Sequence, residues 1–428
     1  MQVASRAVSE AMSHRIGRST VTVRTAEGSP VADADVVVEQ TRHAFAFANI
    51  GFDFIGFANG ETDVRPDSPF GGAAPSAGAR LAELWFELFN TATLPFYWGA
   101  FEPERGHPDT ARLLRTAQWF VDHGCVVKGH PLAWHTLAPQ WLRDLPVDEV
   151  EATVRARIVR EVTDFRGVVD MWDAINEVVI MPVFDKEENG LTRLCQKLGR
   201  VETVRLAVDT ARAANPDATL LLNDFDMSPD YERLIEDCLA AGVRIDALGL
   251  QSHMHQGYWG EEKTLSILER FSRFGLPLHM TETTLLSGHL MPREIVDLND
   301  YQIPDWPSTP EGEERQADEV ARHYTTLVAH PAVQAITYWG LTDDGAWLGA
   351  PGGLVRADGT PKPAYGVLRG LIKDRWWLAP TTVRTDGDGR LGIEGFLGEY
   401  RVTAGDRSGH ITIGSAGDAA TVAEVVVT

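Results

Sequence analysis

Short apolar runs alternate with segments of helical periodicity through the long middle of the chain. In the segments between runs, apolar residues recur at intervals of three and four, as at Leu81, Leu84, Trp85 and Leu88, which is the spacing of one helix face. Eight runs have the length and composition of strands, at residues 45–50, 88–94, 125–129, 169–176, 219–223, 245–251, 276–281 and 334–340. This repeated strand-helix order, without a GxGxxG sequence, favours an α/β fold of the closed (β/α)8 TIM-barrel type over an open doubly wound sheet.

Alternating patterns at both chain ends predict a second, smaller unit. Val21 and Val23 precede a turn signal at residues 26–30 and residues 36–38 follow it, which predicts a β-hairpin. Neither end is long enough to bury much surface alone, so we expect both to pack as one small β module. Beyond Pro380 the short predicted strands are residues 381–385, 391–394, 400–404, 410–413 and 422–427. The predicted domains are residues 1–42 (N-terminal segment and hairpin), 43–378 (barrel) and 379–428 (β module).

The composition excludes several classes of protein. With 39 basic and 61 acidic side chains, the formal charge of −22 opposes binding to phosphate backbones, so we expect no nucleic-acid partner. No apolar run reaches the ~20 residues needed to span a bilayer, so we expect no membrane partner. Residues 1–20 lack the apolar stretch of an export signal, which predicts a cytoplasmic location unless the start is processed or truncated. The widely spaced Cys125, Cys195 and Cys238 match neither a disulfide framework nor a zinc motif.

Polar and aromatic residues gather where the predicted strands end. In a TIM barrel, side chains at the carboxyl ends of the strands face the active site. Their convergence on one rim therefore predicts a catalytic pocket. Seven residues at or just beyond those ends can hydrogen-bond to a sugar or stack on it: His130, Trp134, Asn176, Glu177, Gln251, His253 and Glu282.

Glu177 and Glu282 end strands that two others separate, so we expect the two carboxylates to face each other across the barrel mouth. Paired carboxylates suit glycoside hydrolysis, in which one protonates the leaving oxygen while the other attacks or activates water. Their separation decides between retention and inversion, and the residues alone leave both open. His253 and His255 share one strand face, but no further metal ligand is evident, so we expect no metal and no cofactor.

Six segments then follow one another along residues 45–371 in a recognisable order. They read GHPLAWH at 129–135, WDAINE at 172–177, LNDF at 222–225, IDALGLQSH at 245–253, LPLHMTE at 276–282, and WGLTDDGAW at 339–347 followed by PKPAY at 361–365. Together they resemble glycoside hydrolase family 10, which is best known for endo-β-1,4-xylanases. The resemblance implies a retaining double displacement, with Glu177 as general acid/base and Glu282 as nucleophile.

The same resemblance implies roles for the neighbouring residues. Asn176 resembles the residue that hydrogen-bonds the sugar 2-hydroxyl, and Gln251 and His253 match positions that flank the nucleophile. The residues that match the walls around the sugar at the cleaved bond are His130, Trp134, Trp339 and Trp347.

The pattern breaks on the rim of the second strand. The family typically carries a Glu-Asn pair and a Lys there, which grip the next sugar on the non-reducing side. Aligned on Trp98, this chain has Thr93, Leu94 and Tyr97 at those positions. Each lost hydrogen bond weakens binding by about 1 kcal/mol, so we expect a weakened, closed or refitted subsite, with Tyr97 among the residues that meet the substrate.

Two further departures follow the predicted nucleophile. The family usually has an Asp two residues after it, which pairs with the His equivalent to His253; Thr284 stands here and favours a neutral imidazole. Residues 285–311 form an unusually long segment that contains Trp306. A loop of this length is usually functional, and it could cap the pocket or bind the leaving group.

Three functions are compatible with these features. The first is a retaining glycoside hydrolase that cleaves β-1,4-xylan or xylo-oligosaccharides, as an endo-1,4-β-xylanase does. The second is a β-glycosidase for small glycosides with an apolar aglycone, which the altered subsite and the expected cytoplasmic location favour. The third is a non-catalytic carbohydrate-binding protein, against which the two intact glutamates argue. The sugar, the endo or exo mode, the oligomeric state and the role of the β module stay open.

Overall fold

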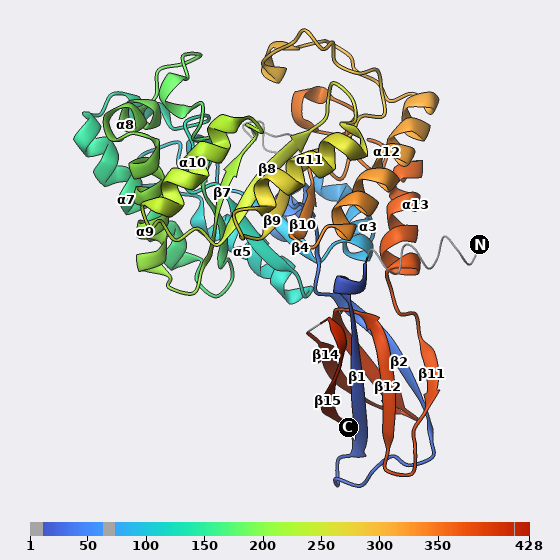
Figure 1. The fold of residues 1–428 in the computed structure, drawn as a ribbon. Coiled ribbons are helices and arrows are strands. Elements are labelled where there is room, and N and C mark those ends of the chain that lie inside the picture. Colours follow the sequence, from blue (N-terminus) through green and yellow to red (C-terminus); the bar gives the residue numbers. More distant parts are fainter. Residues whose placement is uncertain (1–11, 63–72, 415) are drawn as a thin grey trace.

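The computed structural model describes residues 12–62, 73–414 and 416–428, so residues 1–11, where an export signal would begin, lie outside it. Eight parallel strands close into a barrel in the order β10-β3-β4-β5-β6-β7-β8-β9, which confirms the predicted TIM barrel (Figure 1). The barrel strands are β3 (Ala46–Ile50), β4 (Thr91–Pro95), β5 (Val126–His130), β6 (Met171–Asn176), β7 (Thr219–Asp224), β8 (Ala247–His253), β9 (Leu278–Thr284) and β10 (Val333–Tyr338).

Amphipathic helices surround the barrel. In α3, Leu81, Leu84, Trp85 and Leu88 are all buried, as their spacing predicts. Leu88 is the last residue of α3, so the predicted strand at 88–94 began three residues too early, because its apolar run continues the buried helix face. The helices are α2 (Ile55–Ala58), α3 (Gly78–Leu88), α4 (Trp98–Phe101), α5 (Thr110–Asp122), α6 (Gln140–Arg143), α7 (Val147–Asp164), α8 (Gly190–Leu198), α9 (Arg200–Ala214), α10 (Pro229–Ala240), α11 (Gly260–Ser272), α12 (Pro310–Ala329) and α13 (Pro363–Arg369).

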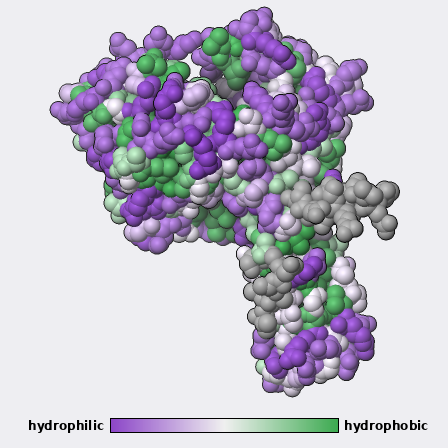
Figure 2. Space-filling view, in the orientation of Figure 1, coloured by the Kyte–Doolittle hydropathy of each residue, from purple (hydrophilic) through white to green (hydrophobic). Residues whose placement is uncertain are grey.

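The outward faces of these helices are polar. Figure 2 shows a barrel surface dominated by hydrophilic residues, with small apolar patches between them. Among the described residues, no helix combines the length and the apolar character needed to cross a bilayer.

Strands from both chain ends form two further sheets below the barrel (Figure 1), and together they make the accessory β module that the sequence predicts. The three-stranded sheet has the order β12-β1-β15, and the four-stranded sheet has the order β11-β2-β13-β14. Valines of β1 and β2 pack with Leu391 and Ile393 in one apolar cluster between them. The strands are β1 (Ile16–Thr25), β2 (Asp35–His43), β11 (Thr381–Arg384), β12 (Arg390–Phe396), β13 (Gly398–Ala404), β14 (Arg407–Ile413) and β15 (Gly417–Val427).

The predicted hairpin between the first two strands is wrong. β1 pairs with β12 and β15, whereas β2 pairs with β11 and β13 in the other sheet. Val21 and Val23 therefore meet Val36 and Val38 face to face across the core, not side by side in one ladder. Both arrangements bury the same alternating valines, so the alternation alone cannot distinguish them.

Arg15 joins the two sheets to the amino-terminal end of the barrel. Its buried guanidinium donates hydrogen bonds to the carbonyls of Val328, at 3.1 Å, and His330, at 2.9 Å. It also lies over the ring of Phe45, which directly precedes β3. The β module is thus attached at the end of the barrel opposite the carboxyl ends of its strands.

Candidate active site

The structure brings every site residue expected from the sequence to the carboxyl end of the barrel. Glu177 directly follows β6, and Glu282 lies in β9, so two strands separate them in the barrel as expected. The residues connected here by hydrogen bonds or ring contacts are Tyr97, His130, Trp134, Asn176, Glu177, Gln251, His253, Glu282, Trp339 and Trp347.

Three amide side chains join the two glutamates. The Asn223 amide donates to Glu282 Oε1 at 2.9 Å and to Asn176 Oδ1 at 2.8 Å. The Gln251 amide donates to the same Asn176 oxygen and to Glu177 Oε1, both at 3.1 Å. Because these amides lie on β6, β7 and β8, the barrel strands themselves fix the position of each carboxylate relative to the other.

Glu177 is held in its protonated form. Burial, and then the negative charge of Glu282, raise the pKa of Glu177 to about 8. The Trp134 indole donates to Glu177 Oε2 at 2.8 Å. The backbone of Glu177 is left-handed, with φ of 58°, an uncommon conformation for a residue with a side chain. Its N–H donates to the Asn223 carbonyl at 2.8 Å, which ties this unusual turn to β7.

Glu282 is held in the opposite state. Burial alone would raise its pKa, but the charge of His130 and the hydrogen bond from His253 outweigh burial and lower the pKa. His253 Nε2 lies 3.0 Å from Glu282 Oε2, and His130 Nε2 lies 3.8 Å from Glu282 Oε1. At neutral pH the pair therefore consists of one carboxylic acid, Glu177, and one carboxylate, Glu282.

His130 is held in place by a buried ion pair between Lys128 and Asp173. Asp173 Oδ2 lies 2.7 Å from His130 Nδ1 and 2.9 Å from Lys128 Nζ, and all three side chains are buried. Burial opposes ionisation of Asp173, but the charge of Lys128 lowers its pKa to about 2. The sequence alone did not indicate this ion pair, and Asn223 was visible only as the end of the predicted strand at residues 219–223. The available signal was a charged residue at an interior position of each of two apolar strands.

Aromatic rings enclose one side of the site. Tyr97, Phe52 and Trp339 form a buried cluster against which Trp134 packs. The Tyr97 ring lies 5.6 Å from His130 and 5.7 Å from Trp134, between ring centroids. Thr93 and Leu94 are fully buried, so two of the three expected replacements offer no polar group to a sugar. Tyr97 is therefore the replacement that borders the candidate site.

Residues 285–311 cross the rim and build a small core of their own. Trp306 is only 5% exposed and packs with Leu286 and Met291, so it is not an open platform for a sugar. The Gln256 amide donates to two carbonyls of the segment, those of Pro292 and Ile295. Near its tip, Asp300 lies 2.8 Å from Lys186 Nζ, which lies in the loop after β6. The segment, which itself follows Glu282, therefore reaches the loops that follow β8 and β6.

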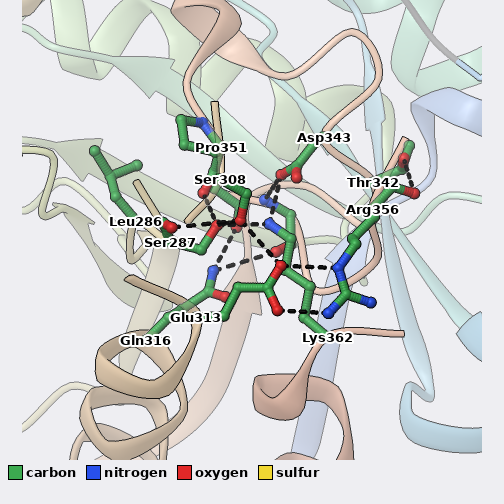
Figure 3. Close-up of polar contacts among 12 residues, drawn as sticks. Leu286, Ser287, Ser308, Glu313, Gln316, Thr342, Asp343, Pro351, Arg356 and Lys362 are labelled. Carbon is green, nitrogen blue, oxygen red and sulfur yellow. Dashed lines mark hydrogen bonds and ion pairs between the residues drawn. The ribbon is translucent and has the colours of Figure 1, made fainter. Parts of the chain in front are cut away.

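A second polar group, here named the Lys362 cluster, fastens this segment to the loop after β10 (Figure 3). Fully buried Lys362 donates to Asp343 Oδ1 at 2.7 Å and to Ser287 Oγ at 2.8 Å. The Arg356 guanidinium pairs with Glu313 on α12. The cluster consists of Ser287, Ser308, Glu313, Asp343, Arg356 and Lys362.

Comparison with known proteins identifies the family. The model of glycosyl hydrolase family 10 matches residues 87–370. The chain belongs to this family. It is 27% identical over 296 residues to endo-1,4-beta-xylanase B of Thermotoga neapolitana, covering 65% of this chain and 78% of that protein. It is also 27% identical to the anti-sigma-I factor RsgI6 of Acetivibrio thermocellus, covering 72% of this chain but only 36% of that protein.

A solved structure of the family shares the fold of this chain. Xylanase 10B from Thermotoga petrophila, crystallised with xylobiose, superposes with a TM-score of 0.60 and 23% identity. The match covers 77% of this chain and 95% of that structure. The protein is accordingly a member of a family of retaining glycoside hydrolases, and its barrel is the fold of that family.

Proposed function

We propose that this family 10 enzyme hydrolyses β-1,4-linked xylan or xylo-oligosaccharides, with Glu177 as general acid/base and Glu282 as nucleophile. The observation that carries the proposal is the chain of amides that joins two glutamates, of which Glu177 has a raised pKa and Glu282 a lowered one. Family membership and the xylanase relative at 27% identity support xylan as the substrate class.

In the first step, Glu282 attacks the anomeric carbon and forms a glycosyl ester. The bond to the leaving oxygen breaks, and that oxygen takes the proton of Glu177. Esterification removes the negative charge of Glu282, which is one of the two main causes that raise the pKa of Glu177. Glu177 is then a carboxylate and becomes a competent base.

In the second step, water attacks the anomeric carbon from the face that the leaving group vacated. Glu177 takes a proton from this water, the ester bond breaks, and Glu282 returns as a carboxylate. Asn176 lies between the two glutamates, where its amide can bind the 2-hydroxyl of the sugar as the transition state develops. Two inversions at one carbon give net retention.

Azide rescue separates the two roles. With a dinitrophenyl β-xyloside, Glu282→Ala should lose turnover, and azide should restore it with an α-glycosyl azide as product. Glu177→Ala should keep the first step, since this leaving group needs no proton, and azide should give the β-glycosyl azide. The matched control is Glu399→Ala, an exposed glutamate in the terminal sheets. Full activity of Glu282→Ala would remove it from the mechanism, and a wild type that binds xylose oligomers without hydrolysing this glycoside would be a binding protein.

A second candidate function is hydrolysis of small glycosides with an apolar aglycone. It is favoured by the rim of β4, where Thr93 and Leu94 are buried and Tyr97 packs into an aromatic cluster. Such a rim gives a polymer chain few hydrogen bonds on the non-reducing side. Polymeric xylan, xylobiose and aryl glycosides should be assayed side by side. Random internal cleavage of xylan would defeat this candidate, and hydrolysis confined to aryl glycosides would defeat the first.

A further inference from the structure

His253 lies between the candidate nucleophile and a threonine. The pairing of β8 with β9 sets His253 opposite Thr284 and Gln251 opposite Glu282. Alternate residues of a strand share one face, so Glu282 and Thr284 both face the imidazole. His253 Nε2 lies 3.0 Å from Glu282 Oε2, and His253 Nδ1 lies 3.0 Å from Thr284 Oγ1.

The two partners differ in what they can donate. As the nucleophile of the proposed mechanism, Glu282 reacts as a carboxylate, which only accepts hydrogen bonds, so His253 Nε2 must carry the hydrogen. A threonine hydroxyl can donate or accept. Thr284 is 4% exposed, and within the described ranges His253 Nδ1 is the one hydrogen-bond partner of its hydroxyl. The hydroxyl hydrogen is therefore satisfied only by donation to an unprotonated Nδ1.

We propose that Thr284 is a positioning residue that keeps His253 as the neutral imidazole with hydrogen on Nε2, so that a neutral donor holds the nucleophile. The proposal rests on the proposed role of Glu282. The other groups around this imidazole are compatible with a neutral ring: the rings of His255, Trp339 and Trp347 lie 4.7–6.0 Å from it, between centroids. The ionisable groups nearby are Glu282 and, across it, His130.

The neutral ring matters for the first chemical step. Glu282 loses its negative charge as the ester forms, so any partner that binds the carboxylate more strongly than the ester raises the barrier. An imidazolium attracts the carboxylate by full charge, whereas a neutral N–H binds it by hydrogen bonding alone. Thr284 therefore preserves the reactivity of the nucleophile while His253 still orients it.

The charge state of His253 can be measured directly by ¹⁵N NMR of the full chain labelled on histidine, with the His253 signal assigned through His253→Gln. At pH 7 the wild type should show one protonated and one unprotonated ring nitrogen. Thr284→Asp, whose carboxylate only accepts, should protonate both nitrogens and lower kcat/KM for a dinitrophenyl β-xyloside by about tenfold. Thr284→Ser should keep the wild-type spectrum and stay within about twofold in kcat/KM.

The matched control is Thr283→Val, which lies on the opposite face of β9, where its hydroxyl contacts Ser252. It should leave the His253 nitrogens unchanged. A wild type with both nitrogens protonated at pH 7 would overturn the proposal, and so would a Thr284→Asp spectrum identical to wild type. The NMR result does not depend on turnover, so it stands apart from Glu282→Ala, whose loss of activity tests the proposed function.

Discussion

The active site and the Lys362 cluster are both buried polar networks, but they treat charge differently. In the Lys362 cluster, each charged group has an opposite partner: Lys362 pairs with Asp343, and Arg356 pairs with Glu313. In the active site, Glu177 forms no ion pair with any residue that the structure describes, and its nearest strong influence is another carboxylate. The ion pairs of the Lys362 cluster stabilise two loops. The active site keeps Glu177 protonated, so that it can donate its proton to a leaving group.

The comparison teaches that residue type alone does not reveal reactivity. Lys362 with two serine hydroxyls contains the elements of a nucleophilic site, yet Ser287 is fully buried and donates to the Pro351 carbonyl. Glu177 is only half-buried and lies at the rim. What distinguishes the reactive Glu177 here is a carboxyl group without an ion-pair partner among the described residues, at a position that a substrate can reach.

The largest effect on activity is expected for Glu282→Gln, which removes the negative charge of Glu282 and leaves its side-chain volume almost unchanged. We expect kcat/KM to fall by at least ~10⁴-fold, because the amide cannot form the ester intermediate. Thermal unfolding should show only a small loss of stability, because the lowered pKa of Glu282 means that the fold favours its carboxylate only modestly. A variant that is clearly destabilised would place Glu282 in the same structural class as Lys362.

Lys362→Met should behave in the opposite way. It leaves Asp343 without its cation, which should cost about 3 kcal/mol of unfolding free energy, while kcat/KM falls less than tenfold. Denaturant unfolding and kinetics on one preparation measure both. Adding Asp343→Asn to the same chain should recover part of the stability, and a double variant less stable than Lys362→Met would contradict the pairing.

The raised pKa of Glu177 should also determine how kcat/KM depends on pH. Because Glu177 must be protonated to act as an acid, kcat/KM should decline about tenfold per pH unit above a pKa of about 8. On the acid side, kcat/KM should fall only at a pH below the ordinary pKa range of a carboxyl group, because the pKa of Glu282 is lowered. An alkaline limb that persists unchanged in Glu177→Gln would assign it to another group.

The raised pKa of Glu177 should also make the folding stability depend on pH. The folded state binds it more tightly than the unfolded chain, whose pKa is the ordinary 4.5, so stability declines as pH rises from there to about 8. Glu177→Gln lacks this decline. Its melting temperature should exceed that of wild type by roughly 2–5 °C at pH 8 and match it near pH 4.5. Equal differences at both pH values would contradict the assignment.

The smallest expected effect concerns Tyr97. A lysine there would restore a cationic donor to the non-reducing side, close to the carboxyl groups of Glu282, Glu177 and Asp173. We expect KM for xylotriose to fall about fivefold in Tyr97→Lys, the equivalent of about 1 kcal/mol. Tyr97→Phe is the control and should not improve KM. A lysine variant with unchanged KM would show that this rim cannot accept a further sugar.

The sequence predicted what depends on local pattern. The eight barrel strands were found because each is a short apolar run, and Glu177 and Glu282 because they end such runs. It did not predict the sheet to which β1 belongs, since Val21 and Val23 are buried equally well in either arrangement. The Lys362 cluster was also beyond reach, because Ser287 and Lys362 are distant in sequence and belong to no common periodic pattern. Asn223 was visible only as a strand end, since its bridging role depends on three strands at once.

The parallel pairing of β1 with β15 has a consequence for biosynthesis. β1, at residues 16–25, hydrogen-bonds to residues 390–396 and 417–427, which leave the ribosome only after all the barrel strands have been made. The barrel can close as soon as β10 is complete, but the edges of β1 and β2 stay uncovered until β11 to β15 have been made. Aggregation of nascent or carboxyl-terminally truncated chains should therefore begin at these two strands and spare the barrel.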